Sequence, residues 1–366
     1  MRLRRSSLLR GFACLALTAA TVGCTSDADD EVDAQGAGAS AEGECAVPEG
    51  ERRELVAGGL ISGSYGPVYV ADGLGYYDDA GIEVEFTTLA NPADALGLLA
   101  GGRLDVYLGA GSAGMLNQIN SGIDVRIAGA GGNIATDEQY DAPSGFYVRK
   151  ELFESGEVTE AADLEGRKVG SFGPSGSAVS YYIGLLLESG GLTLEEVEIV
   201  PLAPPSAMQA LEQGAIAASY LTAPFSSQAV ESGAAVSLGV AKEIYGDEQA
   251  PVIMLGKSLL TDDRATGCAF LAATMRGAEA LQGEYWENPE VAAAFAEKMA
   301  VEPSFIAENA IYNFDPELTN DPRTIEGMQR MFGDLGLLQY DEPLSEDRVF
   351  AEDLRQQAAE AAAVAQ

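Results

Sequence analysis

The chain has 366 residues, a formal net charge of −36 and no histidine. Histidine is the commonest general base and a common metal ligand, so its absence argues against a metal site and against most acid–base enzymes. No carboxylate pair stands out as a general acid and base, and we expect no cofactor. The acidic balance disfavours nucleic acid or an anionic bilayer face as a partner.

The first 23 residues predict export. Arginines crowd the first ten residues and precede a short apolar stretch, 11–23, as in a secretory signal peptide. Arg4-Arg5 could instead belong to a twin-arginine signal, but the residues that follow match it weakly. The stretch ends in Thr21-Val22-Gly23-Cys24, which resembles the bacterial lipobox. We therefore expect Cys24 to be lipidated; the alternative is an ordinary signal peptide with an incidental cysteine.

Residues 24–50 form a predicted flexible tether. Residues 25–33 are almost all acidic or small and polar, and 35–43 are Gly, Ala and Ser with one Glu. Such a segment buries too little to offset the entropy of ordering it. The remaining stretch of about 310 residues is long enough for two lobes. It contains no apolar run that could cross a membrane.

Two cysteines remain beyond the signal peptide and the lipid site. In an oxidising compartment we expect Cys45 and Cys268 to form a disulfide. That bond would pin the end of the tether to a helix late in the chain. The alternative is two separate buried thiols.

From residue 54 the pattern alternates strands and helices. Strands are predicted at 55–61, 82–86, 104–108 and 125–129. Helices are predicted at 68–79, from Asn91-Pro92 onward and at 113–120. The first helix should bring Tyr69, Tyr76 and Tyr77 to the interior. This alternation predicts a parallel sheet with helices on both faces.

A second unit of the same kind begins at Ser144. Leu99–Leu108 and Leu211–Leu221 each contain a helix end, a glycine and a strand ending in Tyr-Leu, which indicates two lobes built alike. After Pro251 one strand and several helices follow, and part of them should return to the first lobe. We predict a discontinuous lobe 1, residues 51–142 plus 249–366. Lobe 2 takes residues 143–248, with crossings near 142 and 248.

Six segments follow one another in a specific order and spacing over roughly residues 54–345. They are Pro67–Ala71, Gly75–Tyr77, Gly81–Glu85, Leu98–Val106, Asp163–Gly170 and Trp286–Glu290. Together they resemble the nitrate/sulfonate/taurine and thiamine-precursor-pyrimidine family of ABC-transporter substrate-binding proteins. The resemblance implies an α/β, two-lobed periplasmic-binding-protein-like fold of type 2. Each lobe would be a mainly parallel sheet flanked by helices, and the lobes would close about a hinge on a small solute.

The chain departs from that family near the expected cleft. Ala217-Ala218 stands where the second-lobe strand usually carries an acid, and Thr222-Ala223-Pro224 replaces a frequent aromatic–acid pair. We therefore do not carry a ligand over from the family. The pyrimidine synthases of this superfamily use a histidine and a cysteine-rich motif, and this chain has neither.

Ligands of open parallel sheets bind at the carboxyl ends of the strands. The candidate ligand residues there are Ser62, Ser64, Tyr65, Asn91, Gly111, Ser112, Ser175, Gly176, Ser177, Tyr220 and Thr222. The strongest candidate is the Ser175–Ser177 turn, because Gly176 permits close approach and a helix start offers N–H donors.

Each candidate also has a structural explanation. Ser175 or Ser177 could serve only to cap the helix. Tyr65 and Tyr220 could sandwich a flat ligand or pack in the core. Asn91 is better explained as a cap than as a contact, and Phe172 is assigned to the core.

Two ligand classes fit these residues: a small oxyanion or sulfonate, or a planar heterocycle. The predicted loops contain no Lys or Arg, and the net charge opposes capture of anions, so the sequence slightly favours a neutral or zwitterionic organic solute.

We therefore predict a monomeric, extracytoplasmic solute-binding lipoprotein, anchored to the outer face of the cell membrane or periplasmic. It would deliver its solute to an ABC permease and the ATPase of that permease, without nucleic acid as a partner. One alternative is a receptor or co-sensor domain that signals to a membrane partner. A pyrimidine-synthase-type enzyme is the least favoured function.

Overall fold

The computed structural model describes residues 45–59, 61–89, 92–134, 144–222, 225–240, 244, 246, 248, 250–308 and 312–364. These residues belong to one compact unit of the chain, Ala39–Gln366. The predicted signal peptide, Cys24 and most of the predicted tether lie outside the described residues. Among the helices that are described, none is both long and apolar enough to cross a membrane.

The first sheet has the strand order β2-β1-β3-β11-β4. Its strands are β1 (Arg53–Gly59), β2 (Ile82–Thr88), β3 (Val106–Ala110), β4 (Val125–Ala130) and β11 (Pro251–Gly256). β1 pairs in parallel with β2 and β3, whereas β11 runs antiparallel to β3 and β4. The strand that follows residue 250 therefore returns to the first sheet, as the sequence predicted.

The second sheet has the order β10-β6-β9-β7-β8. Its strands are β6 (Gly145–Arg149), β7 (Lys168–Ser171), β8 (Glu198–Pro201), β9 (Ala218–Leu221) and β10 (Ala235–Val240). β7 is parallel to β8 and β9, whereas β6 is antiparallel to β9 and β10. A short ladder joins β5 (Asn133–Ile134) to β12 (Tyr312–Asn313).

The two sheets share one topology. Strands β1 to β4 correspond to β7 to β10, and each sheet inserts one antiparallel strand, β11 or β6, between its third and fourth strands. This confirms two lobes built alike and the two-lobed α/β class. In each sheet only the inserted strand runs against the other four, so the sheets are mainly parallel, as predicted, with one antiparallel strand. The inserted strands are the ones nearest in sequence to the chain crossings between the sheets.

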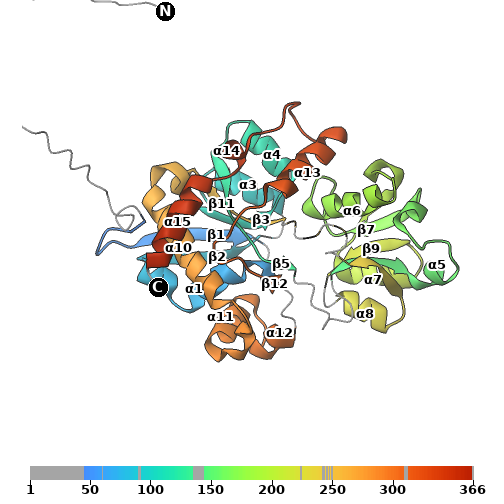
Figure 1. The fold of residues 1–366 in the computed structure, drawn as a ribbon, viewed down its shortest axis with the longest axis horizontal. Coiled ribbons are helices and arrows are strands. Elements are labelled where there is room, and N and C mark those ends of the chain that lie inside the picture. The colour runs from blue at the N-terminus through green and yellow to red at the C-terminus, as the bar shows by residue number, and fades with distance from the viewer. Residues whose placement is uncertain are drawn as a thin grey trace, which may run out of the picture. The chain divides into compact units, whose positions relative to one another are not determined.

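Helices cover both sheets. The helices are α1 (Gly66–Gly73), α2 (Tyr76–Asp79), α3 (Pro92–Ala100), α4 (Ala113–Asn120), α5 (Lys150–Glu154), α6 (Ala178–Ser189), α7 (Pro204–Glu212), α8 (Phe225–Glu231), α10 (Arg264–Ala280), α11 (Pro289–Met299), α12 (Pro303–Glu308), α13 (Pro322–Asp334), α14 (Glu346–Val349) and α15 (Glu352–Val364). Single turns occur at Gly63–Tyr65, Ala161–Leu164, Leu194–Glu196, Ser258–Asp262 and Tyr285–Glu287. Figure 1 shows α5 to α8 around the second sheet and α1, α10 and α15 beside the first.

The helix predicted at 68–79 is divided. It ends at Gly73 and restarts as α2, because Gly75 has a φ of 76° in the left-handed region that glycine favours. Tyr69 and Tyr77 are buried, as predicted. Tyr76 is only half-buried, and the guanidinium carbon of Arg276 lies 4.0 Å from the centre of its ring.

Cys45 and Cys268 form a disulfide, with their Cα atoms 4.9 Å apart. Cys268 lies on α10 and is fully buried. This is the pairing that the sequence predicted, and it attaches the start of the described chain to the core of the first lobe. The two thiols are therefore not separate.

Acid should destabilise the protein through carboxylates such as Glu352. The guanidinium of Arg355 hydrogen-bonds Glu352 and lowers the pKa of that carboxyl below its ordinary value of 4.5. A lowered pKa in the folded state stabilises the fold above pH 4.5, and this contribution disappears as pH falls through the folded-state pKa.

We expect Glu352→Gln to reduce the free energy of unfolding by about 1 kcal/mol at pH 7, because solvent screens part of the pair. The difference from the unmodified protein should shrink as the pH falls below 4.5. Urea unfolding at pH 7 and at a series of lower pH values measures it, and a difference independent of pH would contradict the assignment.

Candidate solute-binding site

The loops that follow β3 and β7, one from each sheet, are in direct contact. Ser112 and Ser177 form an isolated antiparallel bridge, and the amide of Ala113 donates to the carbonyl of Gly176 at 2.9 Å. Parallel strands end at the same edge of a sheet, so the loops after β1 and β9 start next to this contact. We call these loops, residues 61–64, 111–112, 172–177 and 222, the facing edges.

Ser112 and Ser177 cap the helices that begin at the facing edges. The Oγ of Ser112 accepts from the amide of Met115 at 3.2 Å, and the Oγ of Ser177 accepts from that of Ser180 at 3.3 Å. The capping role that the sequence left open for Ser177 is therefore present. A hydroxyl that accepts one hydrogen bond can still donate another, so capping and ligand contact are compatible.

Gly111 and Gly176 allow close approach between elements. Gly176 has a φ of 82°, and a Cβ there would lie 3.0 Å from the Cβ of Ala113 in the other lobe. A Cβ at Gly111 would lie 2.8 Å from the Sδ of Met328 on α13. Gly176 thus serves the contact between lobes, and Gly111 packs against α13.

Of the two alternatives that the sequence left open for Tyr65 and Tyr220, the structure favours packing in the core. Their side chains are only 4% and 3% exposed. The hydroxyl of Tyr65 donates to the carbonyl of Gly109, and burial raises the pKa of Tyr65 well above its ordinary value. The ring of Tyr220 lies 5.1 Å from that of Phe146. Tyr65, in the turn Gly63–Tyr65, and Tyr220, in β9, therefore both belong to hydrophobic cores.

Phe172 and Ile61 are the large apolar residues that the facing edges expose. Their exposed fractions are 44% and 50%. The sequence assigned Phe172 to the core, which is wrong, because it stands one residue beyond the last residue of β7. The centre of its ring lies 6.0 Å from the centre of the Tyr220 ring. The missed signal was a large apolar residue directly before the Gly/Ser loop in both lobes.

The remaining candidates differ in accessibility. Ser62 and Thr222 are half-buried, Ser175 is exposed, and Ser64 is buried with its Oγ 2.9 Å from that of Ser62. The carbonyl of Thr222 accepts from the amide of Phe225 at 3.0 Å. Asn91 lies outside the described residues.

Helix α13 ties the C-terminal region to α6 of the second lobe. Arg330 donates to both carboxylate oxygens of Glu188, at 2.8 and 2.9 Å. Gly327 lies so close to Tyr181 that a Cβ would overlap the tyrosine hydroxyl. That hydroxyl donates to Glu248 at 2.7 Å, in the second crossing between lobes. α6 is therefore held by α13 and by the crossing together.

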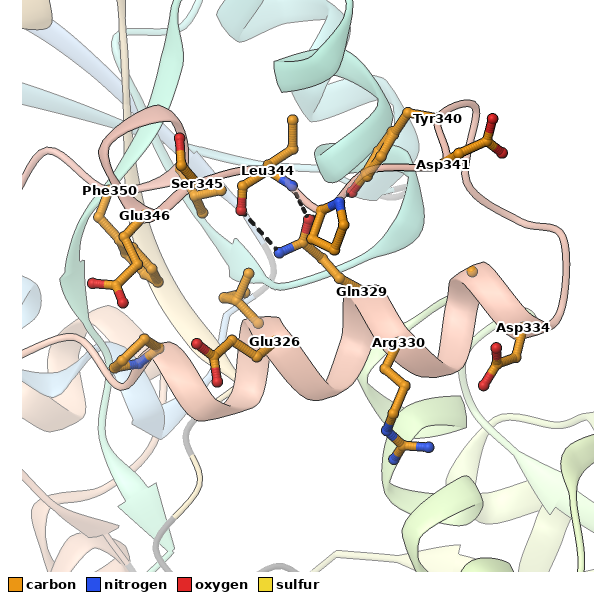
Figure 2. Close-up of a pocket in the computed structure, with 15 residues that line it drawn as sticks. Glu326, Gln329, Arg330, Asp334, Tyr340, Asp341, Leu344, Ser345, Glu346 and Phe350 are labelled. Atoms are coloured by element: carbon orange, nitrogen blue, oxygen red, sulfur yellow. Dashed lines mark hydrogen bonds between the residues drawn. The ribbon is translucent and has the colours of Figure 1, made fainter.

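A cavity of about 720 Å³ lies elsewhere, between α13 and residues 340–350. Figure 2 shows Gln329 bonded to Leu344 across it, while Arg330 points away from that segment. Glu326, Asp341 and other carboxylates border it. None of the candidate ligand residues lines this cavity, so its size does not make it the predicted site.

The two matched sheets and their joined edges define the two-lobed fold of the periplasmic binding proteins. The family model described as NMT1/THI5 like matches residues 63–291. The chain belongs to this family. No curated protein sequence matches it significantly.

Solved structures share this fold at low identity. The periplasmic aliphatic sulphonate binding protein SsuA from Escherichia coli is 17% identical, with a TM-score of 0.62 over 84% of this chain and 100% of that one. A ligand binding component of an ABC-type import system from Staphylococcus aureus, with zinc bound, is 14% identical, with a TM-score of 0.64 over 84% and 99%. The desulfurization enzyme DSZB is 17% identical, with a TM-score of 0.55 over 84% and 99%.

The fold therefore occurs in binding proteins and in an enzyme. In the part of the chain that the structure describes, no three His, Cys, Asp or Glu side chains are grouped to hold a metal ion.

Proposed function

We propose that the protein captures a small solute between its lobes and delivers it to an ABC importer permease. The observation that carries the proposal is the contact of the two matched sheets at their carboxyl edges, where helix starts and hydroxyls from both lobes converge. The import system of the Staphylococcus aureus neighbour supports it. Closure of the lobes on one solute is the expected mode of binding.

We further propose that the protein is exported and anchored by a lipid on Cys24, as a monomer outside the cytoplasm. The N-terminal pattern of the sequence supports this, as do the periplasmic neighbours. The tether of residues 24–50 would let the lobes reach the permease while the lipid stays in the membrane. The proposal includes the lobe boundaries: lobe 1 takes residues 51–142 and 249–366, and lobe 2 takes residues 143–248.

We propose that the protein is not an enzyme, although DSZB shares its fold. The chain has no histidine, and its two cysteines beyond the lipid site are joined as a disulfide. A thiolate nucleophile and a histidine base are therefore both lacking in the folded part. Solute recovered unchanged after incubation with the protein is the expected result.

Uptake by whole cells tests delivery. Deleting the gene should abolish high-affinity uptake of the bound solute, and the full chain supplied in trans should restore it. Unchanged uptake in the deletion strain, with binding intact, would refute delivery and support a receptor that signals to a membrane partner.

Ser177→Ala should weaken both the fold and solute binding. Loss of the α6 cap costs about 1 kcal/mol of stability. Loss of the hydroxyl at the facing edges should raise the dissociation constant about tenfold. Ser155→Ala is the matched control, because Ser155 is an exposed serine at the end of α5, which follows the antiparallel strand β6 and so lies at the opposite edge of the sheet. Calorimetry of both variants measures the effects, and equal affinities would remove Ser177 from the site.

A further inference from the structure

We infer that the solute has an uncharged polar end and a flat apolar portion that packs against Phe172 and Ile61. This inference rests on the proposed capture function and narrows it to a substrate class. It sets the protein apart from a binder of small oxyanions.

The first support is the position of the two apolar side chains. Phe172 follows β7 and Ile61 follows β1, and these strands hold the same place in their sheets. Both side chains are about half exposed, although Phe172 already rests on Tyr220 on one side. A solute that covered both would remove apolar surface from water in each lobe at once, which favours closure.

The second support is that two backbone amides at each of the helix starts at the facing edges already have acceptors. At α4 the amide of Ala113 donates to Gly176, and that of Met115 donates to Ser112. At α6 the amide of Ser177 donates to Pro174, and that of Ser180 donates to the Ser177 hydroxyl. Helix starts hold anions through unsatisfied N–H groups, so these amides offer an anion little.

The third support is charge. The facing edges contain no Lys or Arg, and Arg330, on the helix that packs against α6, is paired with both oxygens of Glu188. A full negative charge removed from water without a cation is strongly disfavoured. Hydroxyls such as those of Ser62, Ser175 and Thr222 suit an uncharged polar group instead. Lys242 lies outside the described residues, so the test must include an anionic probe.

Four probes separate charge from apolar contact: methanesulfonamide, benzenesulfonamide, methanesulfonate and benzenesulfonate. The sulfonamides are uncharged at neutral pH, and each shares the shape of its sulfonate. Titration calorimetry of the full chain at pH 7 should give benzenesulfonamide the lowest dissociation constant. It should bind about tenfold more tightly than methanesulfonamide and more tightly than benzenesulfonate.

Phe172→Ala should weaken benzenesulfonamide binding about tenfold and leave methanesulfonamide unchanged. Phe172→Leu should restore part of the affinity. Phe153→Ala is the matched control, because Phe153 is also an exposed phenylalanine of the second lobe but lies on α5. Melting temperatures close to that of the unmodified protein show that the variants fold.

The inference is overturned if methanesulfonate binds more tightly than benzenesulfonamide and if Phe172→Ala leaves the affinity for methanesulfonate unchanged. Solute capture would still stand in that case. Binding of no probe overturns the inference as well. If the wider solute panel then also fails, the proposed function falls with it.

Discussion

Replacing Gly277 by alanine should destabilise the protein by about 3 to 5 kcal/mol. Gly277 lies on α10 where that helix crosses α1, and the two helices are neighbours in Figure 1. A Cβ there would overlap the carbonyl oxygen of Pro67 and lie 2.9 Å from the amide of Ala71. Because backbone atoms cannot turn aside as a side chain can, α1 and α10 would have to separate.

Gly97→Ala is the matched control for that substitution. Gly97 lies within α3, is exposed, and would place its Cβ in open space. The same change should there stabilise the protein by about 0.5 to 1 kcal/mol, because alanine favours helix over glycine. Urea unfolding measures whether each variant raises or lowers the free energy of unfolding. Loss of stability at Gly97, or none at Gly277, would contradict the packing of α1 on α10.

Breaking the Cys45–Cys268 disulfide should cost about 4 kcal/mol. The bond closes a loop with a sequence separation of 223 residues, and removing so long a loop constraint raises the entropy of the unfolded chain. A protein of this size should then melt about 6 °C lower. Melting with and without a reductant measures the effect.

The double variant Cys45→Ser with Cys268→Ala is the control for reduction. It should melt at the lower temperature and be insensitive to the reductant. If reduction lowers the melting temperature of the unmodified protein by less than about 1 °C, the disulfide does not stabilise the fold as the loop argument requires.

The lobe architecture could be predicted because it repeats in the sequence. The matching segments Leu99–Leu108 and Leu211–Leu221 each run from the end of a helix into the third strand of a sheet, β3 or β9. The direction of β6 and β11 could not be predicted in the same way. A short apolar strand has the same composition in either direction, and its partners are chosen by tertiary contacts.

The site could be predicted only as far as the strand ends. The sequence placed Ser112 and Ser177 there, but not their contact across the lobes, which depends on how the lobes meet. It could not tell whether Tyr65, Tyr220 or Phe172 was buried. Aromatic side chains occur in cores and at binding surfaces alike. Whether such a side chain is buried can depend on a shift of one residue beyond the end of a strand.

Thermal melting of the protein against a panel of small solutes tests the central claim of solute capture most directly. The panel combines nitrate, taurine, sulfonates, pyrimidines, polyamines and small amides with the sulfonamides. A solute present at about 100 times its dissociation constant should add about 2.7 kcal/mol and raise the melting temperature by several degrees. We predict such a shift for an uncharged solute with an apolar portion. A panel without any shift would contradict solute capture.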